Sequence, residues 1–288
     1  MTNIVLCFDH SGESNATALF RLVDQPDQIG WRRYTNNRPE DARTSVASAY
    51  MHLVDSWQPG DDVYVFGAGS GAACAQALTR LLGTIGVLDG ELRSYMLATY
   101  ALPRTARTAQ EWRHVTEVAA DLAEHDDIAL RVRFLGLWDS TRIRGTAGPV
   151  DVVAGRHAVA IGGAPNLQRV EGVDEVWFRG SHRDIVGGPL TLDWMLDGAE
   201  QAGLRVDRTP SAQVEPERLA LNLGLRRVPG DAVVHASVQM HVRTHPRYWR
   251  RLPAQVEWAD QDWLDRGERL MTTTPVPPLP PRALAAAS

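Results

Sequence analysis

The stretch that most constrains this chain is residues 61–77, which read DDVYVFGAGSGAACAQA. Its first half is a short apolar run with β-branched and aromatic members, and such a run predicts a buried parallel strand. Gly67, Gly69 and Gly71 follow at alternate positions, and the alanine-rich segment after them favours a helix. We therefore predict a strand, a very tight turn and a helix that packs closely against the strand.

A turn this tight is typical of a nucleophile elbow, in which a strained backbone holds a catalytic side chain between a strand and a helix. The elbow pattern is Gly-x-Ser-x-Gly. This chain has Gly67-Ala68-Gly69-Ser70-Gly71 instead, with glycine in the middle and serine one residue late. The sequence thus predicts the shape of a hydrolase site and leaves open whether Ser70 is its nucleophile.

The rest of the chain alternates between predicted strands and helices, a pattern that favours an α/β fold. We predict a doubly wound, mostly parallel sheet with helices on both faces, in one domain covering residues 1–271. Residues 272–288 are rich in proline and alanine and predict a flexible tail. Strands are predicted at residues 3–8, 30–34, 128–138, 170–180 and 231–242, and helices at 16–23, 39–57, 109–125 and 190–203.

Composition excludes several classes of protein. The net charge is −5 and we identify no basic block interleaved with aromatic residues, so nucleic acid is not an expected partner. Cys7 and Cys74 lie in apolar surroundings and predict reduced core thiols. The N-terminus has no basic region before its short apolar run, and no run is long enough to span a bilayer. A cytoplasmic location is therefore predicted.

Three predicted strand ends carry the residue types of a hydrolase triad, in the chain order nucleophile, acid, histidine. They present Gly69 and Ser70, then Asp139, then His182. In such a triad the histidine takes the proton of the nucleophile, and the acid fixes the histidine tautomer. The other histidines lack metal-ligand spacing, so neither a metal nor another cofactor is expected.

Further motifs surround these positions. A polar turn follows the first predicted strand, where Asp9 and Asn15 either cap the next helix or line the site. The remaining motifs are Ala49-Tyr50 ahead of Pro59-Gly60-Asp61, the elbow Phe66-Gly67-Ala68-Gly69-Ser70-Gly71-Ala72, Phe134-Leu135-Gly136-Leu137-Trp138-Asp139, Trp177-Phe178-Arg179-Gly180-Ser181-His182-Arg183-Asp184 followed by Gly187-Gly188, residues 192–196 and residues 234–237.

Together these motifs resemble the uncharacterised α/β-hydrolase family catalogued as domain of unknown function 2235, which is similar to the catalytic domain of phospholipase effectors of type VI secretion. The resemblance implies an α/β-hydrolase fold, with Asp139 as the triad acid and His182 as the base. It also implies export by a route that reads no N-terminal signal. The family's serine falls on Gly69 and its arginine on Ser70.

Two readings of the elbow follow. Either the elbow has slipped by one residue and Ser70 is the nucleophile, or Gly69 has replaced the nucleophile. The turn residues Asp9 and Ser11, with the amide of Gly71, are candidates for the oxyanion site. The first reading predicts an esterase or phospholipase acting on a small-molecule or lipid ester. The second predicts an inactive pseudohydrolase that binds a ligand or a protein partner.

Overall fold

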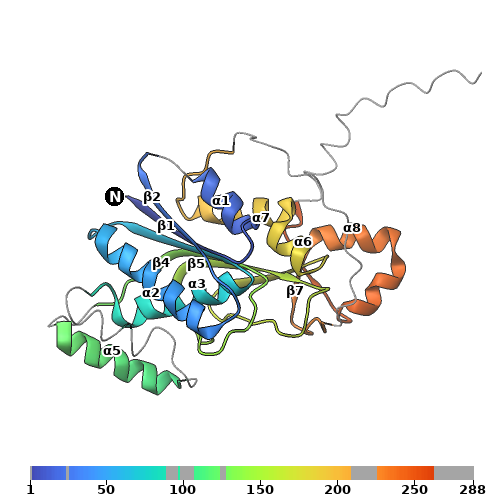
Figure 1. Cartoon of the computed structure of the whole chain (residues 1–288). Coiled ribbons are helices and arrows are strands. Elements are labelled where there is room, and N and C mark those ends of the chain that lie inside the picture. The colour runs from blue at the N-terminus through green and yellow to red at the C-terminus, as the bar shows by residue number, and fades with distance from the viewer. Residues whose placement is uncertain are drawn as a thin grey trace, which may run out of the picture.

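Eight strands form one sheet in the order β2-β1-β3-β4-β5-β6-β7-β8, and every neighbouring pair is parallel (Figure 1). The computed structural model describes residues 2–23, 26–88, 97, 107–123, 128–208 and 226–262. The strands are β1 (Asn3–Asp9), β2 (Gln28–Tyr34), β3 (Asp62–Ala68), β4 (Val132–Trp138), β5 (Val152–Ala160), β6 (Asp174–Phe178), β7 (Val233–His235) and β8 (Glu257–Ala259).

Helices cover both faces of this sheet (Figure 1). On one face lie α2 (Pro39–Ser56), α3 (Ser70–Ile85) and α5 (Ala109–Ala123). On the other lie α1 (Asn15–Leu22), α6 (His182–Gly187) and α7 (Pro189–Gln201). Beside the last strands lie α8 (Ala236–Thr244) and the 3-10 helix η1 (Pro246–Arg251). None of the described helices combines the length and the apolar character needed to cross a membrane.

The central strand β1 shows why the sheet carries two cores. Its successive side chains point to opposite faces, and all of its residues are buried. Leu6 and Phe8 pack with α2 and α3, whereas Val5 and Cys7 pack with α1 and α7. A strand covered on both faces must be apolar throughout, as the run at residues 3–8 predicts.

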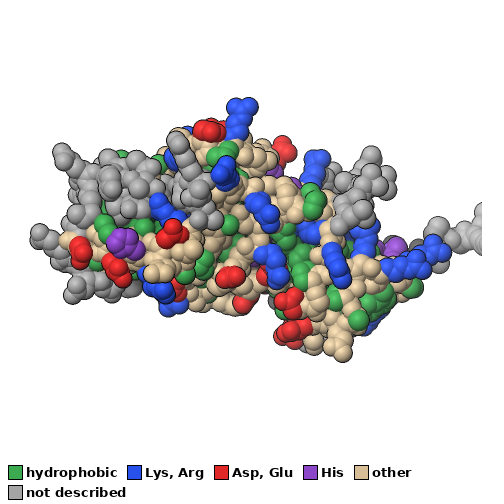
Figure 2. All heavy atoms as spheres, turned by 90° about the horizontal axis from the view of Figure 1, so that it is seen from below, with side chains coloured by type: hydrophobic (Ala, Val, Ile, Leu, Met, Phe, Trp, Pro, Cys, Tyr) green, Lys and Arg blue, Asp and Glu red, His purple; other side chains and the backbone are tan. Residues whose placement is uncertain are grey.

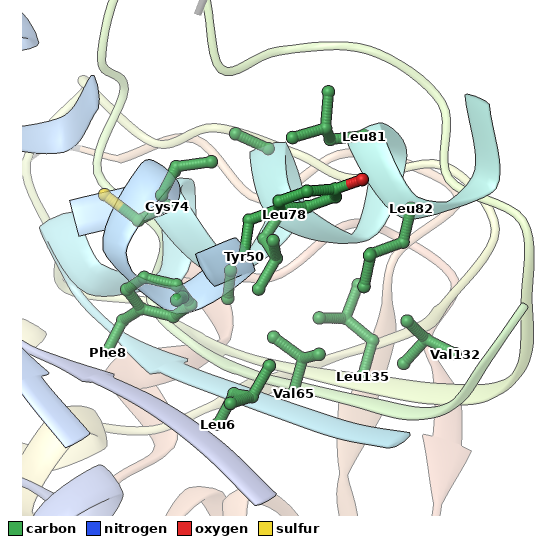
Figure 3. Close-up of a cluster of buried hydrophobic side chains, with 14 of the residues drawn as sticks. Leu6, Phe8, Tyr50, Val65, Cys74, Leu78, Leu81, Leu82, Val132 and Leu135 are labelled. Atoms are coloured by element: carbon green, nitrogen blue, oxygen red, sulfur yellow. The ribbon is translucent and has the colours of Figure 1, made fainter. Parts of the chain in front are cut away.

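Figure 3 shows the first of these cores, where the ring of Tyr50 lies among aliphatic side chains of α3 and the strands. The Tyr50 hydroxyl donates to the carbonyl of Gly86 at 3.0 Å and accepts from the amide of Leu88 at 2.8 Å. One buried phenol thus satisfies two backbone groups where α3 ends.

The predicted doubly wound parallel sheet is confirmed, but one predicted strand is wrong. Residues 231–242 form only the short strand β7, and then α8. The side chain of His235 accepts a hydrogen bond from the amide of Ser237 and so caps a helix where the apolar pattern suggested continued strand. The predicted strand at 128–138 begins only at Val132, and β5 was not predicted. The predicted tail at 272–288 lies outside the described residues.

The buried thiols agree with the prediction of reduced core cysteines, since Cys7 and Cys74 are both free and fully buried. Burial raises the pKa of Cys74 to about 12, with a weaker opposing effect from a hydrogen bond to Thr35. Burial likewise raises the pKa of Cys7 far above its usual value. Neither thiol is a reactive thiolate at neutral pH.

We predict that Tyr50→Phe destabilises the fold by about 1–3 kcal/mol, because two buried backbone groups lose their partner. Urea unfolding followed by circular dichroism measures the effect. Tyr64→Phe is the matched control, because the Tyr64 hydroxyl donates to the carbonyl of Ala202, which also accepts from Arg133 and so keeps a partner when the hydroxyl is removed. A loss for Tyr50→Phe no larger than that of the control would contradict this account.

Candidate active site

The turn between β3 and α3 has the backbone of a nucleophile elbow. Gly69 has φ 58° and ψ −115°, a conformation that residues with a side chain rarely adopt. Glycine is also required two residues before and two residues after Gly69, at Gly67 and Gly71. A Cβ on Gly67 would lie 2.5 Å from the carbonyl oxygen of Gly71, and a Cβ on Gly71 would lie 2.3 Å from that of Phe8. The small residues therefore let α3 pack directly onto β3 and β1.

The strained residue of the elbow is Gly69, and it faces the histidine. A Cβ built on Gly69 would lie 3.2 Å from Nε2 of His182 and 3.3 Å from Nδ1 of His10. In an elbow, this is the position from which the nucleophile side chain projects. In this chain a hydrogen atom stands there.

Ser70 is directed elsewhere. It is the first residue of α3, it is 3% exposed, and its hydroxyl donates to the carbonyl of Thr35 at 3.2 Å. No hydrogen bond joins Ser70 to His182, although the structure describes both residues. The structure therefore does not bring the predicted nucleophile to the predicted base.

The predicted acid and histidine are brought together. Asp139 follows β4 with its own strained backbone, φ 42°, and its side chain is fully buried. Its Oδ2 lies 2.7 Å from Nδ1 of His182, whose side chain is 36% exposed. Ser181 caps α6 reciprocally with Asp184, which fixes the helix end that carries His182. This arrangement leaves Nε2 of His182 directed toward Gly69.

Arg226, which was not among the predicted site residues, completes the surroundings of the acid. Its guanidinium donates to Oδ1 of Asp139 at 2.6 Å, and that oxygen also accepts from the amide of Ala160 at 2.9 Å. Burial raises the pKa of Asp139, but the hydrogen bond from His182 and the charge of Arg226 outweigh it, so the pKa lies below its usual value. Arg226 belongs to no motif, so no sequence pattern indicated this role.

The polar turn after β1 is held by Asp9. Its carboxylate accepts from the amides of His10 at 2.6 Å and Ser11 at 3.2 Å, and from the hydroxyl of Thr17. These bonds fix the turn, while Ser11 is exposed at the edge of a cleft. The helix cap predicted for Asp9 or Asn15 is supplied by Ser14. Asn15 instead ties α1 to the α6–α7 segment through the carbonyls of Ile185 and Gly188.

His10 is a second member of the site that was not among the predicted site residues. Its ring lies 5.5 Å from that of His182, nearly edge to face. Its Nδ1 is buried and makes no hydrogen bond, and it points to the same place beside Gly69 as His182 Nε2 does. Burial, and after it the proximity of His182, lowers the pKa of His10. Two imidazoles thus converge on the elbow.

His10, Ser11 and His182 line a cleft of about 1040 Å³ between α1 and α6. Its lining carries more positive than negative side chains. The acids are Glu13 and Asp184, and Asp184 is engaged in the cap of α6. The basic and histidine side chains are His10, Arg21, Arg179, His182 and Arg183. Among the described residues no group of three or more metal-ligand side chains occurs.

The fold and the site together define an α/β-hydrolase-like protein, as the sequence predicted. Residues 39–157 match the family model described as the catalytic domain of Tle1-like phospholipase effectors of type VI secretion systems. An uncharacterised protein of Saccharomyces cerevisiae is 23% identical over 185 residues. That match covers 48% of this chain and only 26% of the yeast protein.

Two solved structures are less similar to this chain in sequence. Est1E from Butyrivibrio proteoclasticus is 7% identical, with a TM-score of 0.36, covering 70% of this chain and 88% of that one. The RedJ thioesterase of the prodiginine pathway in Streptomyces coelicolor is 13% identical, with a TM-score of 0.35, covering 70% and 93%. The class of this protein therefore rests on its sheet, its elbow and the family match.

The lowered pKa of His10 predicts an acid-sensitive stability. Because the pKa of His10 is lower in the folded state, His10 takes up its proton more readily in the unfolded state as the pH falls below about 6.5. The free energy of unfolding therefore falls as the pH falls. We predict that His10→Gln loses less stability between pH 8 and pH 5 than the wild type, in urea unfolding at each pH. Ser11→Ala, which keeps the histidine, is the control and should follow the wild type. Parallel curves for His10→Gln and the wild type would contradict the assignment.

Proposed function

We propose that this chain is a hydrolase-like protein that forms no acyl-enzyme and binds its ligand non-covalently in the cleft beside His182. The observation that carries the proposal is the position of Gly69. Its backbone has the elbow conformation and its Cβ direction points to Nε2 of His182, while the hydroxyl of Ser70 bonds to the carbonyl of Thr35. Of the two readings of the sequence, this geometry favours the replaced nucleophile.

A slipped elbow would require more than a side-chain rotation. Ser70 already has helical backbone as the first residue of α3, and a Cβ added to Gly67 or Gly71 would clash with neighbouring backbone. Moving Ser70 into the strained position would shift α3 by one residue against β3. The close approach of Gly71 to Phe8 would then be made by a residue with a side chain.

The chemical consequence is large. A serine nucleophile must lie within about 2.6–3.2 Å of its base to be activated. Loss of the nucleophile from a triad costs about 10⁶-fold in kcat. The residues that remain can still bind and orient a ligand, since His182 is held by Asp139 and is exposed to the cleft. The excess of basic side chains in the cleft lining favours a ligand that carries negative charge.

A second candidate function is slow hydrolysis with water as the nucleophile, and the intact Asp139–His182 pair favours it. Water would add to the carbonyl carbon of an ester while Nε2 of His182 takes its proton. That proton would then pass to the alkoxide that leaves. Such a reaction would depend on His182 and would be unaffected by Ser70→Ala.

Labelling with a serine-reactive fluorophosphonate tests the proposal. We predict no adduct on the wild-type protein and, in the Gly69→Ser variant, an adduct on the introduced hydroxyl, mapped by peptide mass spectrometry. The same variant should hydrolyse p-nitrophenyl butyrate at least about 10³-fold faster than the wild type. An adduct on Ser70 of the wild type that disappears in His182→Ala would contradict the proposal and establish the slipped elbow.

Gly69→Ala is the matched control for that gain of activity. Both substitutions place a Cβ at φ 58°, at a cost of about 1–3 kcal/mol, and that Cβ lies equally close to His182 in both. Only serine adds the hydroxyl, so Gly69→Ala should be as destabilised as Gly69→Ser and remain inactive. Equal activity in the two variants would show that the hydroxyl is not the nucleophile.

We further predict that Asp139→Asn in the Gly69→Ser background removes about 10⁴-fold in kcat, because asparagine holds the wrong histidine tautomer. Steady-state kinetics with the same ester measures this. Ser70→Ala in the same background should leave the rate unchanged, since the Ser70 hydroxyl faces Thr35. A rate that falls with Ser70→Ala and not with Asp139→Asn would reverse the assignment of both residues.

A further inference from the structure

A second surface lies apart from the cleft residues of the proposed site, on α8 and η1. The chain has a net charge of −5, but residues 232–256 contain four arginines and no aspartate or glutamate. Arg243, Arg247, Arg250 and Arg251 are all exposed. No ion pair joins any of them to another residue that the structure describes. We name these four, with Met240 and Trp249, the α8–η1 surface.

Apolar side chains lie among these arginines. Trp249 is 46% exposed and Met240 is 37% exposed, so both are among the few large hydrophobic residues that face solvent in the described part of the chain. The ring of Trp249 is supported from the side by Trp258 at 6.1 Å. Figure 2 shows arginine and hydrophobic side chains interspersed toward the right, the side on which Figure 1 places α8.

The buried side of α8 determines which of its side chains face solvent. Val238 and Val242 of α8 are buried against β6 and β7, in the third hydrophobic cluster of the molecule. The residues between and after them therefore face solvent, and η1 buries none of its six residues. Tyr248 of η1 packs against the same cluster, so the exposed Trp249 lies on a helix attached to the core and not on a loop.

We propose that the α8–η1 surface binds an anionic lipid bilayer. Arginines near such a surface gain electrostatic attraction from the lipid phosphates, and tryptophan and methionine enter the region between head groups and acyl chains. Trp249 and Met240 favour this occupant over a nucleic acid, because a phosphodiester backbone offers no apolar layer for a methionine side chain. Residues 247–251 interleave arginine with aromatic residues, so the prediction that the chain has no such segment is wrong.

One residue of the cleft lining interacts electrostatically with α8 and η1. Arg179 lines the cleft, and after burial its charge is the largest influence that lowers the pKa of His241 on α8. Arg179 and Arg251 both act on Tyr248 of η1, whose pKa burial raises. Binding through the α8–η1 surface would therefore hold the cleft near the bilayer, whether or not the site catalyses a reaction.

Co-sedimentation with vesicles tests the proposal. We expect the full chain to bind vesicles of phosphatidylglycerol and phosphatidylcholine, not vesicles of phosphatidylcholine alone, and to dissociate at about 0.5 M salt, where surface charges are strongly screened. Each arginine near an anionic surface contributes about fivefold to binding, so Arg250→Glu with Arg251→Glu should weaken it at least about 20-fold. Trp249→Ala should also weaken binding, and Arg250→Lys with Arg251→Lys should preserve it.

Arg38→Glu with Arg113→Glu is the matched control. It makes the same change of charge at two exposed arginines, one at the start of α2 and one on α5, away from α8 (Figure 1). It should leave vesicle binding unchanged. An equal loss in the control, or no binding by the wild type, would overturn the proposal. So would tighter, Arg250-dependent binding to a DNA oligonucleotide than to the vesicles, which would identify the surface as a nucleic-acid site.

Discussion

The buried carboxylate of Asp139 is the interaction on which this site depends. A charge taken fully out of water must be paired and hydrogen-bonded, and removing one partner of such a group is strongly destabilising. Asp139 meets this demand with His182, Arg226 and the amide of Ala160. These partners come from α6, from the segment after residue 225 and from β5, so one carboxylate ties together the carboxyl edge of the sheet.

If Gly69 has replaced the nucleophile, as we propose, this requirement explains why the acid and the histidine remain. The pair stabilises the fold at the same time as it could serve catalysis, so its presence alone does not identify an enzyme. Gly69 differs in this respect. At φ 58° a glycine relieves strain that any other residue would incur, so replacing a nucleophile there gains stability while it removes the chemistry. At position 69, stability favours glycine whereas catalysis requires a nucleophile. At position 139, both stability and catalysis favour aspartate.

The sequence predicted the structure correctly where a residue is required both by the local sequence pattern and by the packing of the fold. The alternate glycines predicted the close packing of α3 on β3, and strand ends predicted where Asp139 and His182 would meet. The direction of the Ser70 hydroxyl was beyond that reasoning, because it depends on the residue at which α3 begins. Arg226 and His10 were missed because their roles arise from contacts between distant segments. In residues 231–242 the predicted strand ends early, because the side chain of His235 caps α8 and so starts a helix there.

The central claim is that residue 69, and not residue 70, occupies the nucleophile position. A crystal structure of the Gly69→Ser variant tests this most directly. We predict that the new hydroxyl lies within hydrogen-bonding distance of Nε2 of His182, while Ser70 keeps its bond to the carbonyl of Thr35. A structure in which the hydroxyl of Ser70 turns to His182 and the side chain at position 69 points away would contradict the claim.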